Sequence, residues 1–194
     1  MMHQLAETPD AIFQDVWSQL ARATRDRRSE LRWMNLATTT PDGTPRLRTV
    51  VLREVIPATR QIAFHTDRRS SKSSELEVNP RVALHFHDRR GALQIRMEGL
   101  AHASQDFDRV NAWRKLHPGS REQYAQELAP GSEISSPTDA IVRSEATDRG
   151  GFENFTVVAV QIDLIDWLSL AQSGHRRAAF RMSDGIPHCL WLAP

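Results

Sequence analysis

The stretch Arg48-Thr-Val-Val-Leu-Arg53 decides the fold, because it combines the alternation of a β-strand with a cation at each end. One face of such a strand would carry Arg48, Val50 and Leu52, and the other would carry Thr49, Val51 and Arg53. An apolar strand of this kind can lie along a flat ligand while its guanidinium groups donate paired hydrogen bonds to a phosphate. Taken alone, it is more often a strand with solvated ends than a ligand site.

Further segments of apolar and β-branched residues flank this stretch and are separated by turn signals. They cover residues 31–40, 61–66, 81–87, 92–102, 156–168, 177–182 and 188–192, and the stretch itself extends over 46–55. Pro41-Asp-Gly-Thr-Pro45 and Asp88-Arg-Arg-Gly91 join neighbouring strands as hairpins. Helical patterns interrupt the strands at residues 71–79, 105–116 and 120–128. The sequence therefore predicts a mainly β fold with α insertions, an antiparallel barrel with flanking helices.

Thr8-Pro-Asp10 carries the signals of a helix start, with a capping hydroxyl, a proline and a carboxylate near the positive end of the dipole. We expect an N-terminal helix within residues 1–28 that ends in a basic stretch. Residues 129–151 contain few apolar side chains and exceed the usual loop length of about 15 residues, so they form a functional lid or a poorly ordered loop. No repeat or shift in composition marks a second domain, and residues 1–194 are expected to form one.

The composition excludes several classes of partner. A formal net charge of +1 over 194 residues gives no general attraction for nucleic acid. No segment approaches the roughly 20 apolar residues of a membrane span, and the N-terminus does not resemble a secretory signal, so we expect a cytoplasmic protein without a membrane partner. The single cysteine, Cys189, cannot form an internal disulfide, which agrees with a reducing compartment.

Ser70-Ser-Lys-Ser-Ser74 places hydroxyls and an ammonium group at the expected start of a helix, where free backbone N–H groups favour an anion. A polar loop with a helix cap is an equally good interpretation. Two further patterns, three histidines and a basic run, are better explained without a ligand site. His65, His85 and His87 have a poor spacing for a metal site with Glu98, and we expect no metal. The basic run between Arg22 and Arg32 is interrupted by carboxylates and is best explained as a solvated helix end.

Taken together, these motifs resemble the FMN-binding split barrels related to pyridoxamine 5′-phosphate oxidase. The stretch 48–53 resembles the family's Arg-x-Val-Leu-Leu-Lys strand, and Phe64-His-Thr-Asp67 its Phe-Tyr-Thr-Asn. Leu164-Ile-Asp-Trp167 and His175-Arg-Arg177 resemble the family's Ile-Glu-Phe-Trp and His-Asp-Arg, with one residue of slippage between them. The resemblance implies an antiparallel, Greek-key split β-barrel that binds FMN at the interface of a homodimer.

The resemblance also assigns the site residues. The strand along the cofactor would be Arg48, Thr49, Val50, Val51, Leu52 and Arg53; His65 and Thr66 would lie near the flavin and its phosphate, Ser71 and Lys72 at the phosphate, and Gln94, Trp167 and Arg177 at the ring system. His175 and Arg177 are the candidates to approach a substrate. Trp113, His117 and Arg121 stand where the oxidase holds its substrate's phosphate, which implies a different substrate.

These expectations define a hypothesis and two alternatives. The hypothesis is an FMN-dependent oxidoreductase acting on an unidentified small molecule. The first alternative is a non-catalytic flavin carrier or sensor in which residues 129–151 contact a partner. The second is a metal-binding enzyme with a cupin-like barrel, which would contain iron or zinc and no flavin.

Overall fold

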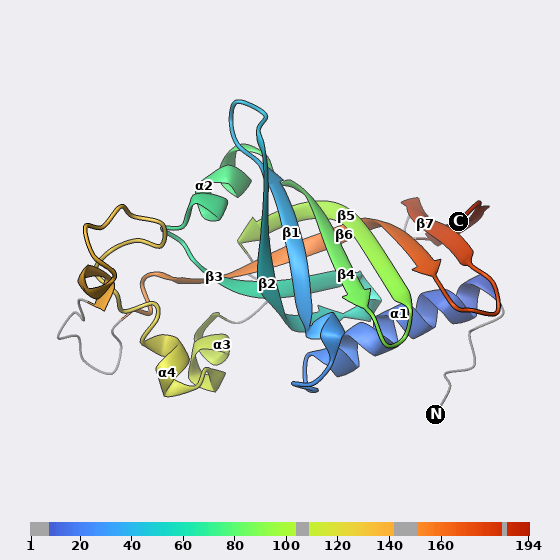
Figure 1. Ribbon diagram of the computed structural model, residues 1–194, viewed down its shortest axis with the longest axis horizontal. Helices are drawn as coiled ribbons and strands as arrows, with labels where there is room; N and C mark the ends of the chain where they lie inside the picture. Colours follow the sequence, from blue (N-terminus) through green and yellow to red (C-terminus); the bar gives the residue numbers. More distant parts are fainter. Residues whose placement is uncertain (1–7, 104–108, 142–150, 184–185) are drawn as a thin grey trace.

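The computed structural model describes residues 8–103, 109–141, 151–183 and 186–194 and contains a closed antiparallel β-barrel (Figure 1). The strands follow the order β3-β2-β1-β4-β5-β6, and a β3–β6 pairing closes the barrel. β7 and β8 continue the sheet beyond β6 as a hairpin. The predicted mainly β, antiparallel barrel fold is confirmed.

The strand bounds are β1 Trp33–Thr39, β2 Pro45–Ile56, β3 Gln61–Asp67, β4 Arg81–Asp88, β5 Leu93–Ala103, β6 Phe155–Ser169, β7 Arg176–Ser183 and β8 Ile186–Leu192. The α-helices are α1 Pro9–Ala23, α2 Ser71–Val78, α3 Arg109–Lys115 and α4 Pro118–Arg121. Short 3₁₀ helices cover Glu30–Arg32 (η1), Pro57–Thr59 (η2) and Pro137–Ile141 (η3). None of the described helices is long and apolar enough to cross a membrane.

The core follows from strand alternation, because every second side chain of each barrel strand points inward. Met34, Leu52 and Phe64 are among the completely buried side chains of this interior. α1 extends the same cluster through Val16, Trp17 and neighbouring apolar residues. A second, smaller cluster lies on the outer face of β3 and β6, where α3 and the following turn cover it.

β6 is the longest strand and changes partner along its length. Its first half pairs with β3 up to Gln161, and its second half pairs with β7 from Leu164 onward, while β5 follows nearly all of it. The register with β5 shifts at Glu98/Gly99. A Cβ on Gly99 would lie 2.2 Å from the carbonyl oxygen of Gln161, so only glycine allows this close approach.

The structure refines the predicted helices. α1 begins after the Thr8 cap as expected, but it ends at Ala23, before the basic stretch; residues 1–7 lie outside the described part. The helix predicted over 120–128 is wrong beyond Arg121. Asn154 donates to the carbonyl group of Tyr124, which such a helix would pair with the N–H group of Leu128, and Arg69 donates to the carbonyl groups of Gln126 and Glu127. Two further predictions are covered only in part. Residues 105–108 of the predicted helix over 105–116, and residues 142–150 of the predicted loop over 129–151, lie outside the described residues.

Candidate functional site

The predicted site residues separate into three groups, the first of which surrounds Arg48 on β2. The guanidinium group of Arg48 donates to the carboxylate of Glu75 at 2.8 Å and to the hydroxyl of Thr38. Thr38 donates to the same carboxylate at 2.5 Å. Burial opposes the charge of Glu75, but the hydrogen bonds from Thr38 and Arg48 outweigh it and lower the pKa of the carboxyl group. Glu75 is therefore a buried anion that holds Arg48 against α2.

Lys72, at the start of α2, completes this group, which we call the cradle: Thr38, Arg48, Thr66, Ser70, Lys72 and Glu75. The ammonium group of Lys72 donates to the hydroxyls of Thr66 at 3.0 Å and Ser70 at 3.1 Å. Burial, followed by the nearby charge of Arg48, lowers the pKa of Lys72. Both hydroxyl residues are buried. Two cations and a helix N-terminus thus converge on one place, where burial makes a matching anion favourable.

The chemistry of the cradle fits a phosphate group. Lys72 is held by neutral hydroxyls instead of a carboxylate, so an arriving anion would relieve the repulsion between Lys72 and Arg48. Ser71 is the first residue of α2 and is exposed beside these groups. The sequence predicted Arg48, Arg53, Thr66, Ser71 and Lys72 at a phosphate. The structure brings four of them to the junction of β2, β3 and α2, whereas Arg53 lines a different pocket.

The remaining residues of the β2 stretch divide between the two faces of the barrel. Val50 and Leu52 belong to the core and have little or no exposed surface. Thr49 and Val51 lie on the outer face, where Val51 is paired in register with Trp33, which is 56% exposed. The outer face thus offers an apolar strip at Trp33 and Val51, whereas the side chains of Val50 and Leu52 pack in the barrel interior.

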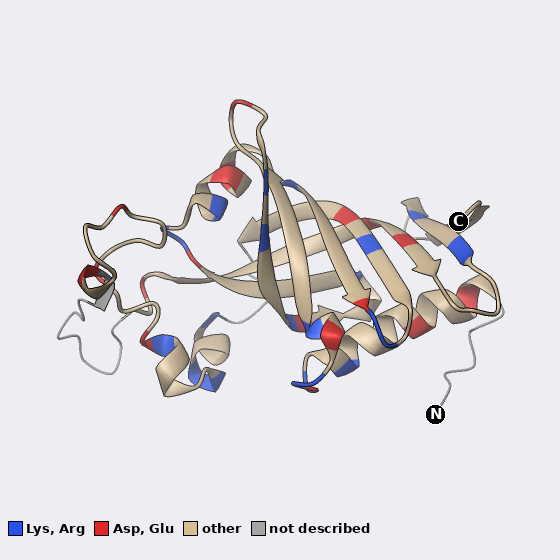
Figure 2. Ribbon diagram, viewed as in Figure 1, with Lys and Arg blue, Asp and Glu red and all other residues tan. Residues whose placement is uncertain are grey.

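Arg53 and His65 form a second group, apart from the cradle. The β2–β3 register shifts between Leu52 and Glu54, so Arg53 is the extra residue of a β-bulge, and both Arg53 and Glu54 line the same pocket. His65 lies on the outer side of β3, opposite to its neighbour Thr66 in the alternation of the strand. We call this hollow of about 650 Å³ the basic pocket; it is lined by Thr24, Arg25, Arg32, Arg53, Glu54, His65, Asn111, Lys115 and apolar neighbours. In Figure 2, basic residues gather where α1 ends and along α3 and α4.

Gln94 and Arg177 form the third group, on the outer face of β5, β6 and β7. Gln94, Leu168 and Arg177 are consecutive partners across these strands. Arg177 binds Asp166 with two hydrogen bonds of 3.0 and 2.7 Å, and Arg96 donates to the same carboxylate. Burial opposes the charge of Asp166, but the hydrogen bonds from Arg177 and Arg96 outweigh it and lower its pKa.

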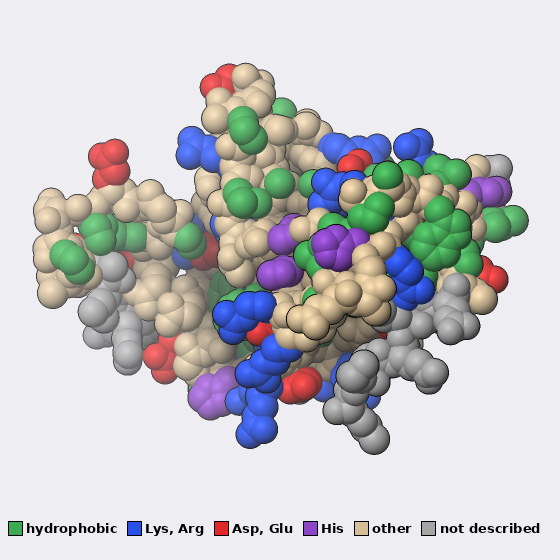
Figure 3. All heavy atoms as spheres, turned by 45° about the vertical axis from the view of Figure 1, so that its right-hand side comes forward, with side chains coloured by type: hydrophobic (Ala, Val, Ile, Leu, Met, Phe, Trp, Pro, Cys, Tyr) green, Lys and Arg blue, Asp and Glu red, His purple; other side chains and the backbone are tan. Residues whose placement is uncertain are grey.

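Trp167 does not share the outer face with Arg177. It faces the core and is 3% exposed, so it has almost no surface for a ligand. The register places Leu168 opposite Arg177 and Trp167 opposite Ala178. His175 is exposed in the turn before β7. Figure 3 brings this side of the molecule forward and shows hydrophobic side chains mixed with basic ones.

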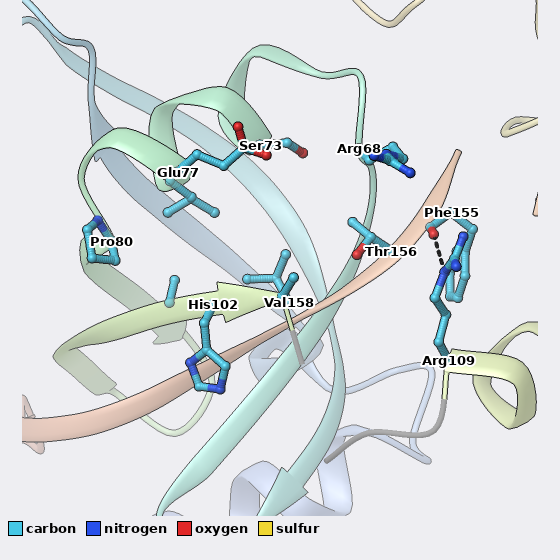
Figure 4. A pocket seen from close by; sticks show the side chains of 12 residues that line it. Arg68, Ser73, Glu77, Pro80, His102, Arg109, Phe155, Thr156 and Val158 are labelled. Atoms are coloured by element: carbon cyan, nitrogen blue, oxygen red, sulfur yellow. Dashed lines mark hydrogen bonds between the residues drawn. The ribbon is translucent and has the colours of Figure 1, made fainter. Parts of the chain in front are cut away.

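A further hollow of about 600 Å³ lies beside the cradle, between α2, the ends of β5 and β6, and α3 (Figure 4). Ser73 connects the two places, since its hydroxyl contacts that of Ser70 at 3.2 Å and also lines the hollow. Arg109 at its edge is engaged, because it donates to the carbonyl group of Phe155 at 2.7 Å. Arg68, Glu77, His102 and Thr156 supply its other polar side chains.

Sequence analysis missed several of these residues. Thr38 and Glu75 gave no signal, because their role depends on the pairing of β1 with β2 and on the packing of α2. Arg25 and Arg32 belonged to a run interpreted as solvated. Trp113, His117 and Arg121 have structural roles: Trp113 is buried, His117 caps α4, and Arg121 donates to the carbonyl of Trp113 at 3.1 Å.

The three histidines of the metal alternative do not come together. His85 and His87 lie on β4 with their rings stacked 6.3 Å apart, whereas His65 lies on β3, three strands away in the barrel. Among the described residues there is no group of three or more histidine, cysteine, aspartate or glutamate side chains that could hold a metal ion.

Comparison with known proteins identifies the family. Residues 14–105 match the family model described as "Pyridoxamine 5′-phosphate oxidase, FMN-binding domain". A pyridoxine/pyridoxamine 5′-phosphate oxidase from Cupriavidus necator is 30% identical over 165 residues, which cover 78% of this chain and 74% of the relative. The corresponding oxidase of Sphingopyxis alaskensis is 38% identical over 146 residues, 75% of this chain but only 63% of the relative.

A solved structure agrees with the fold. A pyridoxamine 5′-phosphate oxidase-related, FMN binding protein from Nostoc punctiforme superposes with a TM-score of 0.74 at 22% identity, and the match covers 98% of this chain and 100% of that one. Barrel, cradle chemistry and sequence similarity thus point the same way. The chain belongs to the FMN-binding family related to pyridoxamine 5′-phosphate oxidase, and its cofactor is FMN.

Proposed function

We propose that this protein is an FMN-dependent oxidoreductase that acts on a small molecule and binds its flavin between two copies of the chain. The observation that carries the proposal is the cradle, in which Lys72 is held only by hydroxyls while Arg48 lies beside it. Arg48, Lys72, Thr66, Ser70 and Ser71 would bind the phosphate of FMN. When bound, the flavin supplies the redox chemistry by accepting and passing on two electrons.

The distance between the cradle and the group around Arg177 supports a flavin site that is shared between two copies of the chain. Thr66 pairs with Thr156 near the start of β6, whereas Arg177 pairs with Leu168 near its end. These positions are 12 residues apart, which corresponds to about 40 Å along an extended strand. One mononucleotide cannot span that length. Gln94 and Arg177 would therefore act on the flavin held in the cradle of a second copy.

The outer face of the barrel offers a surface for that second copy. Trp33 is 56% exposed and Leu47 is 70% exposed, and both lie on the outer face of the β1–β2 pair next to Thr49 and Val51. Exposed aromatic and aliphatic side chains at a sheet face are typical of protein interfaces. Covering this strip would exclude water from the ring system of the flavin.

In this arrangement the protein provides placement and charge. Gln94 would donate a hydrogen bond from its amide to the ring system. Arg177, held by Asp166 in one orientation, would place a positive charge near the reacting edge and stabilise negative charge that develops there. His175, exposed in the adjoining turn, would contact the substrate.

The test begins with protein purified without added cofactor. We expect a yellow protein that releases FMN on denaturation at a ratio close to one per chain, and a dimer by light scattering. Reduced flavin should then be reoxidised in a cycle that depends on a substrate. Bound flavin without any such cycle across a broad substrate panel would favour a carrier or sensor, and protein that binds no added FMN would contradict the proposal.

A further inference from the structure

The cradle contains a buried carboxylate among its cations. Glu75 is 6% exposed, and its carboxylate accepts hydrogen bonds from the hydroxyl of Thr38 at 2.5 Å and from the guanidinium group of Arg48 at 2.8 Å. On the β1 side the carboxylate therefore meets a neutral, buried hydroxyl. A carboxylate inside an anion site repels the anion that the site would bind, so Glu75 has an effect on binding beyond holding Arg48.

The charges of the cradle do not match those of a phosphate. Its three ionised groups, Arg48, Lys72 and Glu75, have a net charge of +1, because two cations face one carboxylate. A phosphate monoester carries about −1.5 to −2 charges at pH 7. Binding it without any further change would leave a largely buried site with a net negative charge. Such a state is costly, because buried charges are stable only when they are paired.

The charged groups around the cradle do not supply the missing positive charge. On β3, Asp67 forms an ion pair of 2.7 Å with Arg69, so these two charges cancel. Arg46 on β2 and Arg68 before α2 are exposed, and solvent and salt screen their charges. On β5, which also packs against α2, the exposed His102 faces the neighbouring hollow of about 600 Å³.

Glu75 can supply the missing charge by taking up a proton. Burial already acts against its ionised form, and the hydrogen bonds from Thr38 and Arg48 are what keep its pKa low. An anion that shares Arg48 would weaken one of these hydrogen bonds and would also repel the carboxylate. Both changes raise the pKa of Glu75. With Glu75 protonated, two cations face a phosphate dianion and the charges are equal.

We propose that Glu75 couples FMN binding to the uptake of one proton, which moves from the solvent to its carboxylate when Arg48 and Lys72 bind the phosphate. This inference rests on the proposed function, since it takes the cradle as the place of the FMN phosphate. Linkage then requires that binding weaken about 10-fold for each unit by which the pH rises. The protein is thus loaded with flavin at lower pH and releases it at higher pH.

Calorimetry counts the proton. FMN is titrated at pH 7.5 into the full chain freed of flavin, in two buffers with different enthalpies of ionisation. We expect uptake of about one proton per FMN and an affinity about 10-fold weaker at pH 8 than at pH 7. Riboflavin, which has no phosphate, should bind without uptake. FMN binding without proton uptake would overturn the proposal.

Three variants identify the group that takes up the proton. Glu75→Gln should abolish the uptake, and uptake that survives there would overturn the proposal. Lys72→Arg keeps the cation but cannot exchange its proton in this range, so its uptake should persist; a loss would assign the proton to Lys72 instead. Glu77→Gln removes an exposed carboxylate of the same helix that has no bond to the cradle, and should leave the uptake unchanged.

A second measurement replaces the Glu75→Gln variant if that protein does not fold. Sulfate, which stays a dianion between pH 7 and 8, competes with FMN for the Lys72→Arg protein. Neither the ligand nor residue 72 can then accept a proton, so an affinity for sulfate that still weakens about 10-fold from pH 7 to 8 supports Glu75. An affinity for sulfate that does not change with pH would overturn the proposal.

The proposal and the proposed function fail in different ways. FMN binding with proton uptake but without any substrate-dependent cycle would refute the oxidoreductase and support the role of Glu75. Flavin binding and turnover without proton uptake would refute the role of Glu75 alone. Protein that binds no FMN would refute both.

Discussion

The cradle and the basic pocket each contain an arginine of β2, but the hydrogen-bond partners of the two arginines differ. Arg48 is paired with Glu75 and Thr38, and Lys72 with two hydroxyls. Arg53, five residues later, has a buried Nε atom without a partner among the described residues, and it shares its pocket with Arg25, Arg32, Lys115 and one carboxylate, Glu54. The cradle is thus pre-organised by internal partners, whereas Arg53 and His65 in the basic pocket each leave a buried nitrogen atom without a partner among the described residues.

The largest expected difference between the two regions concerns FMN itself. Replacing both Arg48 and Lys72, as Arg48→Ala with Lys72→Met, removes two charge-assisted contacts worth about 1.5–3 kcal/mol each, and should weaken FMN binding at least 100-fold. Arg53→Met should weaken it less than 10-fold, because Arg53 lies in the other region. Flavin fluorescence quenching measures both. Equal losses in the two proteins would mean that one site extends over both regions.

The Glu75→Gln variant tests whether Glu75 holds Arg48 in place before FMN binds. The variant leaves Arg48 without its carboxylate, so we expect the flavin-free protein to lose about 2–3 kcal/mol in its free energy of unfolding. FMN should restore much of this loss, because its phosphate would take the place of the carboxylate. Urea denaturation with and without FMN provides the measurement. A loss that is the same in both conditions would show that Glu75 does not stand in for the phosphate.

His65 in the basic pocket makes the free energy of unfolding of the protein depend on pH. Burial, with the charge of Arg53, lowers its pKa from 6.5 to about 3. Between these values the unfolded chain binds a proton that the folded chain does not, so the free energy of unfolding falls as the pH falls below 6.5. At about 1.4 kcal/mol per pH unit, the loss by pH 5 reaches about 2 kcal/mol. His65→Gln protein should lack this contribution, and denaturation of both proteins at pH 7 and 5 checks it; parallel losses would refute it.

Two aspartates outside both regions show how much buried and exposed ion pairs contribute to the free energy of unfolding. Asp166 is buried and binds Arg177 and Arg96, whereas Asp163 on the same strand forms an exposed ion pair with Arg81. Asp166→Asn should cost about 1–2 kcal/mol of stability and Asp163→Asn less than about 0.5 kcal/mol. Thermal or urea denaturation ranks the two. The reverse order would mean that burial does not set the strength of these pairs.

Much of the fold could be predicted because strand alternation and turn residues are local signals. The β2 stretch, the hairpins and α2 lie close to their predicted positions for this reason. The helix expected over 120–128 ends at Arg121. Asn154, distant in sequence, binds the carbonyl group of Tyr124 that the helix would have used, and Arg69 binds those of Gln126 and Glu127. Such tertiary hydrogen bonds leave no periodic trace in the sequence.

The candidate site was predictable in composition but not in grouping. The sequence suggested that Arg48 and Arg53 serve one phosphate, but strand alternation places them on opposite faces of β2, and the structure has Arg53 in the basic pocket on the outer side. Trp167 was assigned because Leu164-Ile-Asp-Trp167 resembles the family's Ile-Glu-Phe-Trp, yet the register turns it into the core and leaves Leu168 outside. Alternation identifies which residues share a face, but only the pairing register identifies which face is outside.

The change of partner along β6 has a consequence for how this protein tolerates altered length. An insertion of one residue within β6 would turn Trp167 outward and Asp166 inward, because side chains alternate along a strand. The same insertion would move Gln161 away from the one glycine that permits its carbonyl to approach. Length variation among relatives should therefore be confined to the hairpin connections at residues 40–44, 89–92 and 170–175, and β6 should keep a constant number of residues.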